Sequence, residues 1–443
     1  EVIDGKSERG GYPVVRKNMK QWVIDQVAFA DKLLEGLNEI DWPESTKEMQ
    51  RHWIGRSEGV EVDFQIVGGG SFSIYTTCIE TIYGITFMVL APDGQIVKDL
   101  MPRIENKEEV EAYIAETLKK NDMDRTELNK TKSGCRLQGI SAINPVNGKE
   151  VPLFIGDFVL ANYGTGAVMA VPSHDQRDFE YAIVHNIPMI QVIDGGDVSE
   201  KAFEKGEYLG KGCKLMNSEE FTGYVVEDAK EAITKKLEAM GVARRKVNYH
   251  FREWIFARQR YWGEPVPVVY LEDGNIHVLD DAELPLILPE LSDYKGKNGK
   301  APLENATEWK QYNHNGVTGT RETSTMPGSA GSSWYFLRYI DPDNENELAN
   351  YELLKHWMPV DLYIGGPEHT VGHLMYSRIW NRYLYDKGLS PVKEPFKKLV
   401  HQGMILGSNG IKMGKRFPEF VVNPSDIVRD YGADTLRLYE MFM

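Results

Sequence analysis

The sequence predicts an α/β protein in which a compact α+β region is inserted into a core of parallel strand–turn–helix units. Two observations indicate this organisation. Residues 60–245 show mixed strand and helix patterns, and the pattern of apolar residues changes on either side of this region. Farther along, an apolar strand at 361–364 leads through a glycine turn into a helix over 371–385, which favours a parallel βα unit. We therefore divide the 443 residues into segments 1–59, 60–245, 246–395 and 396–443.

The other elements follow from the spacing of apolar residues. Helical spacing predicts helices over residues 22–37, 48–53, 110–118, 176–184 and 229–240. Runs rich in β-branched and aromatic residues predict strands at 72–74, 83–90, 151–159, 166–171, 266–270 and 333–339. Residues 284–319 are rich in turns and show little periodicity.

Composition and charge narrow the function. A formal net charge of -15 argues against a general nucleic-acid binder but leaves room for a local basic face, for which the candidates are residues 130–132, 244–246 and 397–398. Each of these clusters has the alternative interpretation of a solvated turn or helix end. The sequence contains three cysteines, Cys78, Cys135 and Cys213, which are far apart, so we expect no structural zinc site. Their odd number is typical of a protein from a reducing compartment. No window approaches the ~18 apolar residues of a membrane span.

A glycine-rich turn marks the first candidate site. Gly365 and Gly366 follow the strand at 361–364, and Glu368 and His369 come next. Ligands of open α/β sheets bind at the carboxyl ends of strands, where glycine permits close approach to the backbone and a carboxylate suits a ribose diol. His369 and His373 are spaced to share a helix face. That spacing also suits zinc, but no further cysteine or carboxylate pattern supports a metal, and packed histidines are the simpler interpretation.

Two lysines mark a second candidate segment. Lys412 and Lys415 follow the sequence Gly407-Ser408-Asn409-Gly410 in a predicted loop. Lysines in a mobile loop can approach a triphosphate and neutralise the charge that develops as pyrophosphate leaves. Pairs of solvated surface lysines are common, so the spacing alone leaves both interpretations open.

Hydroxyl and carboxyl groups in the inserted region form the third candidate site. Thr76, Thr77 and Thr81 stand at the end of a predicted strand, where their hydroxyls can donate to a carbonyl oxygen or position water. Asp178 is expected near the start of a helix, where acidic residues often serve as caps. Adjacent residues point in different directions, so Ser173-His174-Asp175 is not expected to act as a catalytic relay.

Several motifs together resemble class I aminoacyl-tRNA synthetases. The segment Lys412-Met413-Gly414-Lys415-Arg416 is similar to their KMSKS signature, and it stands between His401-Gln402-Gly403-Met404 and Asn423-Pro424 in the order of the leucyl, isoleucyl and valyl enzymes. Residues 4–11, 51–59, 258–265 and 331–335 resemble bacterial leucyl-tRNA synthetases in particular. Residues 76–81 and 164–178 resemble the editing pocket of the same family.

The resemblance implies a fold and an activity. It implies an incomplete Rossmann-type parallel-sheet catalytic core in segments 1–59 and 246–395, an editing domain in 60–245, and the KMSKS loop with the start of a helical stem-contact region in 396–443. The implied enzyme ligates leucine to tRNA(Leu) with ATP and Mg²⁺, hydrolyses mischarged tRNA(Leu), and works as a cytoplasmic monomer away from membranes. An isoleucyl or valyl enzyme, or a tRNA-binding module with a silent editing pocket, is the alternative.

The resemblance also assigns roles to residues. Tyr363, His369 and His373 are implied to line the leucine pocket. The implied ATP-binding residues are Gly366, Glu368, Gln402, Lys412 and Lys415. In the editing domain the implied residues are Thr76, Thr77, Thr81 and Asp178: Asp178 pairs with the α-ammonium of the mischarged amino acid, Thr81 is a wall against leucine, and a positioned water attacks the ester.

Three departures from the family pattern bear on activity. Family members read T-T-R-P-D-T where this chain has Cys78, Ile79 and Glu80 in place of Arg, Pro and Asp, which removes a possible cationic partner of the tRNA end. In the KMSKS segment, Gly414 and Arg416 replace serines. No HIGH-type His-x-x-His stands near the start, so we expect an internal fragment in which adenylation is inactive.

Overall fold

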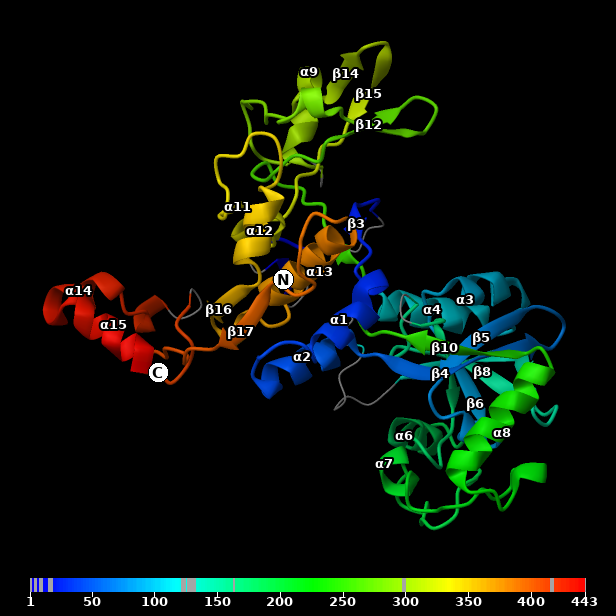
Figure 1. The fold of residues 1–443 in the computed structure, drawn as a ribbon. Coiled ribbons are helices and arrows are strands. Elements are labelled where there is room, and N and C mark those ends of the chain that lie inside the picture. Colours follow the sequence, from blue (N-terminus) through cyan, green and yellow to red (C-terminus); the bar gives the residue numbers. More distant parts are fainter. Residues whose placement is uncertain are drawn as a thin grey trace. The chain divides into compact units, whose positions relative to one another are not determined.

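The computed structural model describes residues 2–3, 6–7, 11–14, 19–120, 125, 133–161, 164–296, 300–414 and 418–442 (Figure 1). Part of motif 4–11, the basic cluster at 130–132, Lys415 and Arg416 therefore lie outside the described residues. The chain divides into two compact units. Unit 1 contains Glu1–Arg16 and Ser57–Asn248, and unit 2 contains Lys17–Arg56 and Tyr249–Met443. Within the described ranges, no helix combines the length and apolar character that crossing a membrane requires.

Unit 1 is built on one mixed sheet. In its described part the strand order is β10-β4-β7-β8-β6-β9, with β5 paired to the other side of β4. The strands are β4 (Ser57–Ile66), β5 (Ser71–Thr76), β6 (Phe87–Leu90), β7 (Gly134–Ile143), β8 (Glu150–Gly156), β9 (Ala167–Ala170) and β10 (Ala243–Asn248). All of these pairs are antiparallel except β6 with β8. A further short pair joins β1 (Val2–Ile3) to β2 (Lys6–Ser7).

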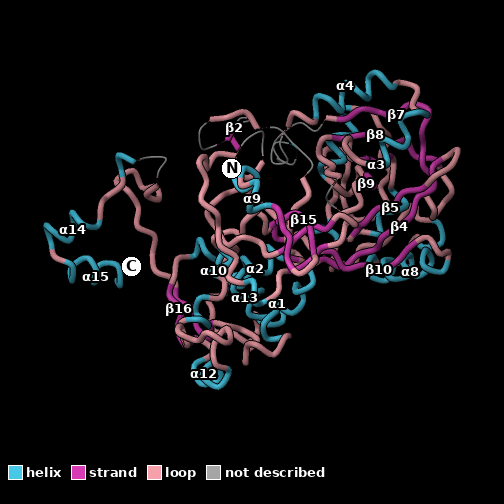
Figure 2. The backbone as a smooth tube through the Cα atoms, turned by 90° about the horizontal axis from the view of Figure 1, so that it is seen from above, coloured by secondary structure: helices cyan, strands magenta, loops and turns pink. Residues whose placement is uncertain are grey.

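The helices of unit 1 pack on this sheet. They are η2 (Ile79–Gly84), α3 (Gln95–Leu100), η3 (Met101–Arg103), α4 (Lys107–Thr117), α6 (Gln176–Val184), α7 (Lys205–Tyr208), η4 (Glu219–Phe221) and α8 (Val226–Ala239). Helix α8 buries Val226, Ala229, Ile233 and Leu237, a spacing that gives one apolar stripe. Its stripe joins the same core as the inward residues of β4 and β5. Figure 2 shows α8 beside β10 and α4 beside β7, so the helices cover the sheet at different strands.

Unit 2 combines helices with small sheets. Its helices are η1 (Val27–Phe29), α1 (Ala30–Gly36), α2 (Glu44–Ile54), η5 (Asp281–Glu283), η6 (Pro302–Asn305), α9 (Thr307–Lys310), α10 (Ser329–Ser332), α11 (Tyr335–Arg338), α12 (Tyr351–Trp357), η7 (Pro367–His369), α13 (His373–Asp386), η8 (Pro418–Phe420), α14 (Pro424–Tyr431) and α15 (Ala433–Phe442). Its strands are β3 (Val23–Ile24), β11 (Trp254–Ile255), β12 (Val268–Leu271), β13 (Ile276–Val278), β14 (Gln311–His314), β15 (Val317–Arg321), β16 (Val360–Ile364) and β17 (Phe396–Val400).

One parallel pair organises the part of unit 2 that matters for the site. Strand β16 pairs with β17 in parallel, and α13 connects them, as the predicted strand–turn–helix unit requires. A parallel bridge from Asp41 to Lys398 extends this arrangement beyond β17. The fold is thus mixed α/β. Among the described residues of unit 2, strands pair in parallel between β16 and β17 and at the bridge from Asp41 to Lys398.

Several predicted elements differ from the structure. The strand predicted at 333–339 is wrong, because α11 (Tyr335–Arg338) is helical there. Phe336 and Leu337 pack into the apolar core around Phe396, and this tertiary packing overrides the β propensity of aromatic residues. The helix predicted over 22–37 begins only at Ala30, since Val23–Ile24 pairs as β3 with β11. The strand predicted at 83–90 is shortened to β6 by η2.

We predict that residues 57–248 fold without the rest of the chain. Their core is closed by their own strands and helices, and their ends meet because Ser57 pairs with Asn248 across β4 and β10. Domains with close termini commonly fold alone. Circular dichroism and urea unfolding of this segment should show native secondary structure and one cooperative transition. A disordered segment with no transition would contradict the prediction.

Candidate synthetic and editing sites

A pocket of about 530 Å³ opens in unit 2 at the end of β16. It is lined by Ser329, Ser332, Tyr363, Ile364, Gly365, Gly366, His369, His373, Leu374, Leu399 and Gln402. The structure thus brings together all three residues predicted for the leucine pocket and two of those predicted for ATP. Ser329 and Ser332 were missed, because their segment was predicted to lead into a strand rather than to form the helical turn α10.

A chain of hydrogen bonds fixes the aromatic wall of this pocket. The hydroxyl of Tyr363 is hydrogen bonded to the Tyr335 hydroxyl at 2.8 Å and to His373 Nε2 at 2.7 Å. Burial, followed by the charge of His369, lowers the pKa of His373, which favours the neutral imidazole. Burial and the Tyr335 hydroxyl raise the pKa of Tyr363, so its proton stays in place. The wall is therefore polar, uncharged and oriented.

The two pocket histidines do not share a helix as predicted. His369 ends η7, whereas His373 begins α13. The turn between the two elements nevertheless holds their rings 6.4 Å apart and perpendicular. The prediction of proximity is confirmed and the prediction of a common helix face is wrong.

Glu368 and Lys412 meet beside the pocket. Lys412 Nζ donates to Glu368 Oε1 at 3.1 Å, although the two residues are far apart in sequence. The carboxylate also folds back on the turn: a Cβ placed at Gly366 would lie 2.1 Å from Glu368 Oε2. A side chain at 366 would therefore push the end of the Glu368 side chain out of this position. Hydrogen bonding to its own backbone N–H, then to Lys412, lowers the pKa of Glu368 and keeps it anionic.

In unit 1, Cys78 organises the predicted threonine cluster. Its N–H donates to Thr76 Oγ1 at 3.0 Å, and its carbonyl accepts from Thr81 Oγ1 at 2.8 Å and from the Thr81 N–H at 3.1 Å. Thr81 is only 1% exposed. The three threonines thus surround one compact turn, in which the backbone of Cys78 rather than its side chain makes these bonds.

Asp178 is buried with one carboxylate oxygen left over. The helix cap is Asp175, whose Oδ1 accepts from the Asp178 N–H at 3.0 Å, so Asp178 is not itself the cap. Its Oδ2 accepts from the Val171 N–H at 2.9 Å, while Oδ1 has no hydrogen-bond partner among the described residues and lies 3.8 Å from Arg177 Nε. Burial, and then the charge of Asp175, raises the pKa of Asp178 to about 7. A buried carboxylate without a full set of partners is suited to a cationic group from outside.

The backbone connects Asp178 to the threonine turn. The segment that begins at Thr81 continues through η2, where a Cβ at Gly84 would lie 3.1 Å from Val171 Cγ1. Two residues later, the Thr86 N–H donates to the Ala170 carbonyl at 3.3 Å. Val171, which binds Asp178, therefore packs against the segment that carries Thr81.

His174 is held by the backbone and takes no part in a relay. Its Nδ1 is bonded to the Phe203 carbonyl at 3.0 Å, and its Nε2 accepts from the Val192 N–H at 3.0 Å. Burial lowers its pKa, which favours the neutral ring. Because both ring nitrogens are occupied, the expectation that Ser173-His174-Asp175 is not a catalytic relay is confirmed.

Charge clusters and metal ligands add little to either site. The basic residues at 244–246 are neutralised, since Arg244 and Lys246 bind Glu61 and Arg245 binds Glu231. No set of three or more histidine, cysteine or acidic side chains in the described ranges is arranged to hold a metal ion.

Comparison with known proteins yields two family matches and matches to 102 chains of solved structures. Residues 51–238 match the leucyl-tRNA synthetase editing domain, and residues 236–442 match the class I tRNA synthetases for isoleucine, leucine, methionine and valine. The whole chain superposes on the agnB2 LeuRS of Agrobacterium radiobacter K84, solved as a ternary complex with tRNA and LeuAMS, with a TM-score of 0.80 and 32% identity. The chain spans 52% of the length of that protein.

These matches identify the chain in two steps. A class I synthetase region that is joined to an editing domain defines the class of aminoacyl-tRNA synthetases with proofreading. The editing-domain match and the structural match are both specific for leucine, and the chain belongs to the leucyl-tRNA synthetase family.

We predict that Asp178→Asn stabilises the protein at alkaline pH. A carboxyl whose folded pKa is about 7, above its usual ~3.9, loses stabilising free energy as pH rises through that range, whereas asparagine does not. Urea unfolding should show the variant more stable than wild type by about 2–4 kcal/mol at pH 8 and by less at pH 5. Glu180→Gln, an exposed change on the same helix, is the control, and a difference that does not depend on pH would contradict the assignment.

Proposed function

We propose that this chain serves a leucyl-tRNA synthetase that ligates leucine to tRNA(Leu) with ATP and hydrolyses mischarged tRNA(Leu) in unit 1. The main observation that supports the editing function is Asp178 Oδ1. This oxygen is buried, receives no hydrogen bond from the described residues, and lies in a region that matches the editing domain. A substrate ammonium supplies the missing partner, and the charge-assisted bond orients the amino acid.

The editing chemistry needs no covalent intermediate. Water attacks the ester carbonyl carbon, the bond between that carbon and the ribose oxygen breaks, and a proton passes from the water to the ribose oxygen. Asp178 anchors the α-ammonium, the hydroxyls of Thr76 and Thr77 orient the carbonyl and the water, and Thr81 limits the length and branching of the side chain. The chemical need is clear, because one methylene gives only about 1–3 kcal/mol of discrimination, a general limit for which aminoacyl-tRNA synthetases are themselves the usual example.

The synthetic half is supported by the pocket in unit 2. Tyr363, His369 and His373 form the leucine side, and Gly366, Glu368 and Gln402 face the adenosine. Lys412, together with Lys415 in the KMSKS segment, binds the phosphates of ATP, which arrives with Mg²⁺. The family match supports ATP as a substrate, and the β16–α13–β17 unit supports a Rossmann-type core in segments 1–59 and 246–395 around the editing domain at 60–245. The proposed protein is a cytoplasmic monomer.

The first test is deacylation of norvalyl-tRNA(Leu) by the chain. Wild type should hydrolyse the ester, and Asp178→Asn should lower kcat/KM roughly 30- to 1000-fold, because a charge-assisted contact to the ammonium is lost. Glu180→Gln should leave the rate unchanged. If the wild-type protein binds tRNA(Leu) but does not hydrolyse the ester, the alternative function is favoured, namely a tRNA-binding module with a silent pocket. That alternative is motivated by Cys78 and Ile79, which replace the Arg and Pro of the family motif.

The second test asks whether Thr81 is the residue that excludes leucine from the editing site. We predict that Thr81→Ala hydrolyses correctly charged leucyl-tRNA(Leu), since removing a buried β-branched side chain makes room for the leucine branch. Thr81→Val keeps the volume but loses the hydroxyl that bonds to Cys78, so it should still exclude leucine. Rates on leucyl and norvalyl esters are compared for all three proteins. If valine opens the pocket as alanine does, the hydrogen bond and not the volume excludes leucine.

A further inference from the structure

Lys230 reaches from helix α8 to the threonine turn. Its Nζ donates to the Thr77 carbonyl at 2.9 Å, across 153 residues of sequence. Within the helix, the buried Thr234 hydroxyl donates to the Lys230 backbone carbonyl at 2.7 Å. A lysine on a helix rich in Lys and Glu is expected in solvent. Here the side chain is half-buried and is committed to a backbone oxygen of the candidate editing site.

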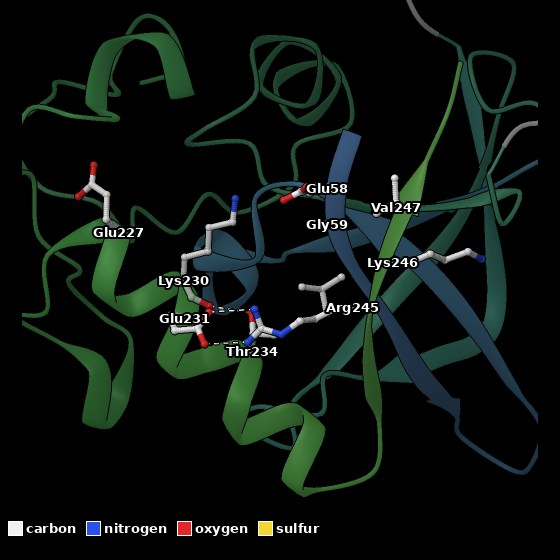
Figure 3. A pocket seen from close by; sticks show the side chains of 10 residues that line it. Glu58, Gly59, Glu227, Lys230, Glu231, Thr234, Arg245, Lys246 and Val247 are labelled. Atoms are coloured by element: carbon white, nitrogen blue, oxygen red, sulfur yellow. Dashed lines mark hydrogen bonds and ion pairs between the residues drawn. The ribbon is translucent and has the colours of Figure 1, made fainter. Parts of the chain in front are cut away.

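A cavity of about 340 Å³ lies beside this contact (Figure 3). Its lining contains Lys230, Gly59 and charged residues of α8 and β10. The other cations of the lining have carboxylate partners: Arg245 binds both oxygens of Glu231 at 2.8 and 2.9 Å, and Lys246 binds Glu61. Lys230 differs from them, since its ammonium donates to the Thr77 carbonyl. Gly59 of the lining lies against the same segment, because a Cβ at Gly59 would lie 2.4 Å from the Thr76 carbonyl.

The threonine turn contains no basic residue of its own. Its sequence, Thr76-Thr77-Cys78-Ile79-Glu80-Thr81, includes one acid, Glu80, which is 0% exposed and receives a hydrogen bond from the Tyr208 hydroxyl at 3.0 Å. Burial raises the pKa of Glu80, while its own backbone N–H and then the charge of Lys230 lower it. Lys230 therefore acts on the turn as a hydrogen-bond donor to its backbone, and its charge opposes part of the rise that burial causes in the pKa of Glu80.

We propose that Lys230 is a positioning residue of the editing site, which holds the Thr76–Thr81 turn at the spacing that admits norvaline and excludes leucine. The proposal rests on the proposed editing function. Lys230 touches neither the ester nor the water; it works through the Thr77 carbonyl, and so through the hydroxyls on either side of Cys78. When the ammonium is removed, the turn is free to shift, and the site should lose discrimination along with rate.

The test compares Lys230→Met, Lys230→Arg and Lys235→Met in the full chain. Methionine keeps the length of the stem and removes the donor; arginine restores a cationic donor; Lys235 lies on the same helix, is exposed and pairs with Glu231, so it is the matched control. The measured quantity is the ratio of the rates of hydrolysis of norvalyl- and leucyl-tRNA(Leu). This ratio does not depend on the fraction of folded protein, and urea unfolding of each variant is followed in parallel.

Lys230→Met should lower the ratio about tenfold or more, the size expected when one charge-assisted hydrogen bond is lost. Lys230→Arg should keep the ratio within about threefold of wild type, and Lys235→Met should not change it. An unchanged ratio in Lys230→Met, with wild type active, overturns the positioning role and leaves the editing function standing. A lower ratio that arginine does not restore, together with a lower unfolding midpoint, also overturns it, because Lys230 is then a packing residue. If the wild-type protein hydrolyses neither ester, the proposed editing function itself is contradicted.

Discussion

The pairing of β4 with β10 is the constraint on which unit 1 and its site depend. It runs from Ser57 opposite Asn248 to Val62 opposite Ala243, so the segments where the chain enters and leaves the unit lie side by side. The same strand fixes the site, because Val60 faces Arg245 on one side and Thr76 on the other. Helix α8 immediately precedes β10, and Lys230 on it therefore reaches Thr77. Since a slip of one residue turns every side chain of a strand to the other face, the register of β4 sets both the domain junction and the threonine turn.

Unit 1 contains buried polar side-chain atoms that have no hydrogen-bond partner among the described residues. Asp178 Oδ1, Glu80 Oε2 and Ser173 Oγ are all buried without hydrogen-bond partners in the part of the chain that the structure describes. An unsatisfied buried group costs about 1–3 kcal/mol, so each of these atoms favours a polar partner from outside the chain. Asp178 Oδ1 has the Arg177 guanidinium 3.8 Å away but no hydrogen-bond donor among the described residues, so this oxygen keeps the capacity to accept a hydrogen bond. Glu80 differs from Asp178 in its partners. The Tyr208 hydroxyl donates to its Oε1, and the charge of Lys230 opposes part of the rise that burial causes in its pKa, whereas Oε2 has no hydrogen-bond partner among the described residues.

The sequence located the sites better than it described how they are built. Periodicity gave helix α6 its correct bounds, and the glycine turn after 361–364 correctly marked the pocket in unit 2. What periodicity could not show was which contacts override local preference. The residues Tyr335–Arg338 are helical because of their packing around Phe396, and the partner of Lys230 lies 153 residues away in the sequence. Thr76 and Thr81, two of the three threonines that match the family motif, are tied together by the backbone of Cys78, so these bonds do not depend on the side chain at 78.

The pocket in unit 2 is preorganised by a buried polar network behind its walls. Thr46 and Gln50 are one turn apart on α2; Thr46 Oγ1 is bonded to His401 Nε2 at 2.7 Å, and Gln50 Nε2 donates to the Thr370 carbonyl at 2.7 Å. His401 Nδ1 in turn bonds to the Gly365 carbonyl at 2.7 Å, so one helix holds both loops that line the pocket. Arg378, fully buried, completes the network by binding Gln50 and both oxygens of Glu394. Because breaking a buried pair leaves an uncompensated charge, this network resists rearrangement and ties the backbone at Gly365 and Thr370 to α2.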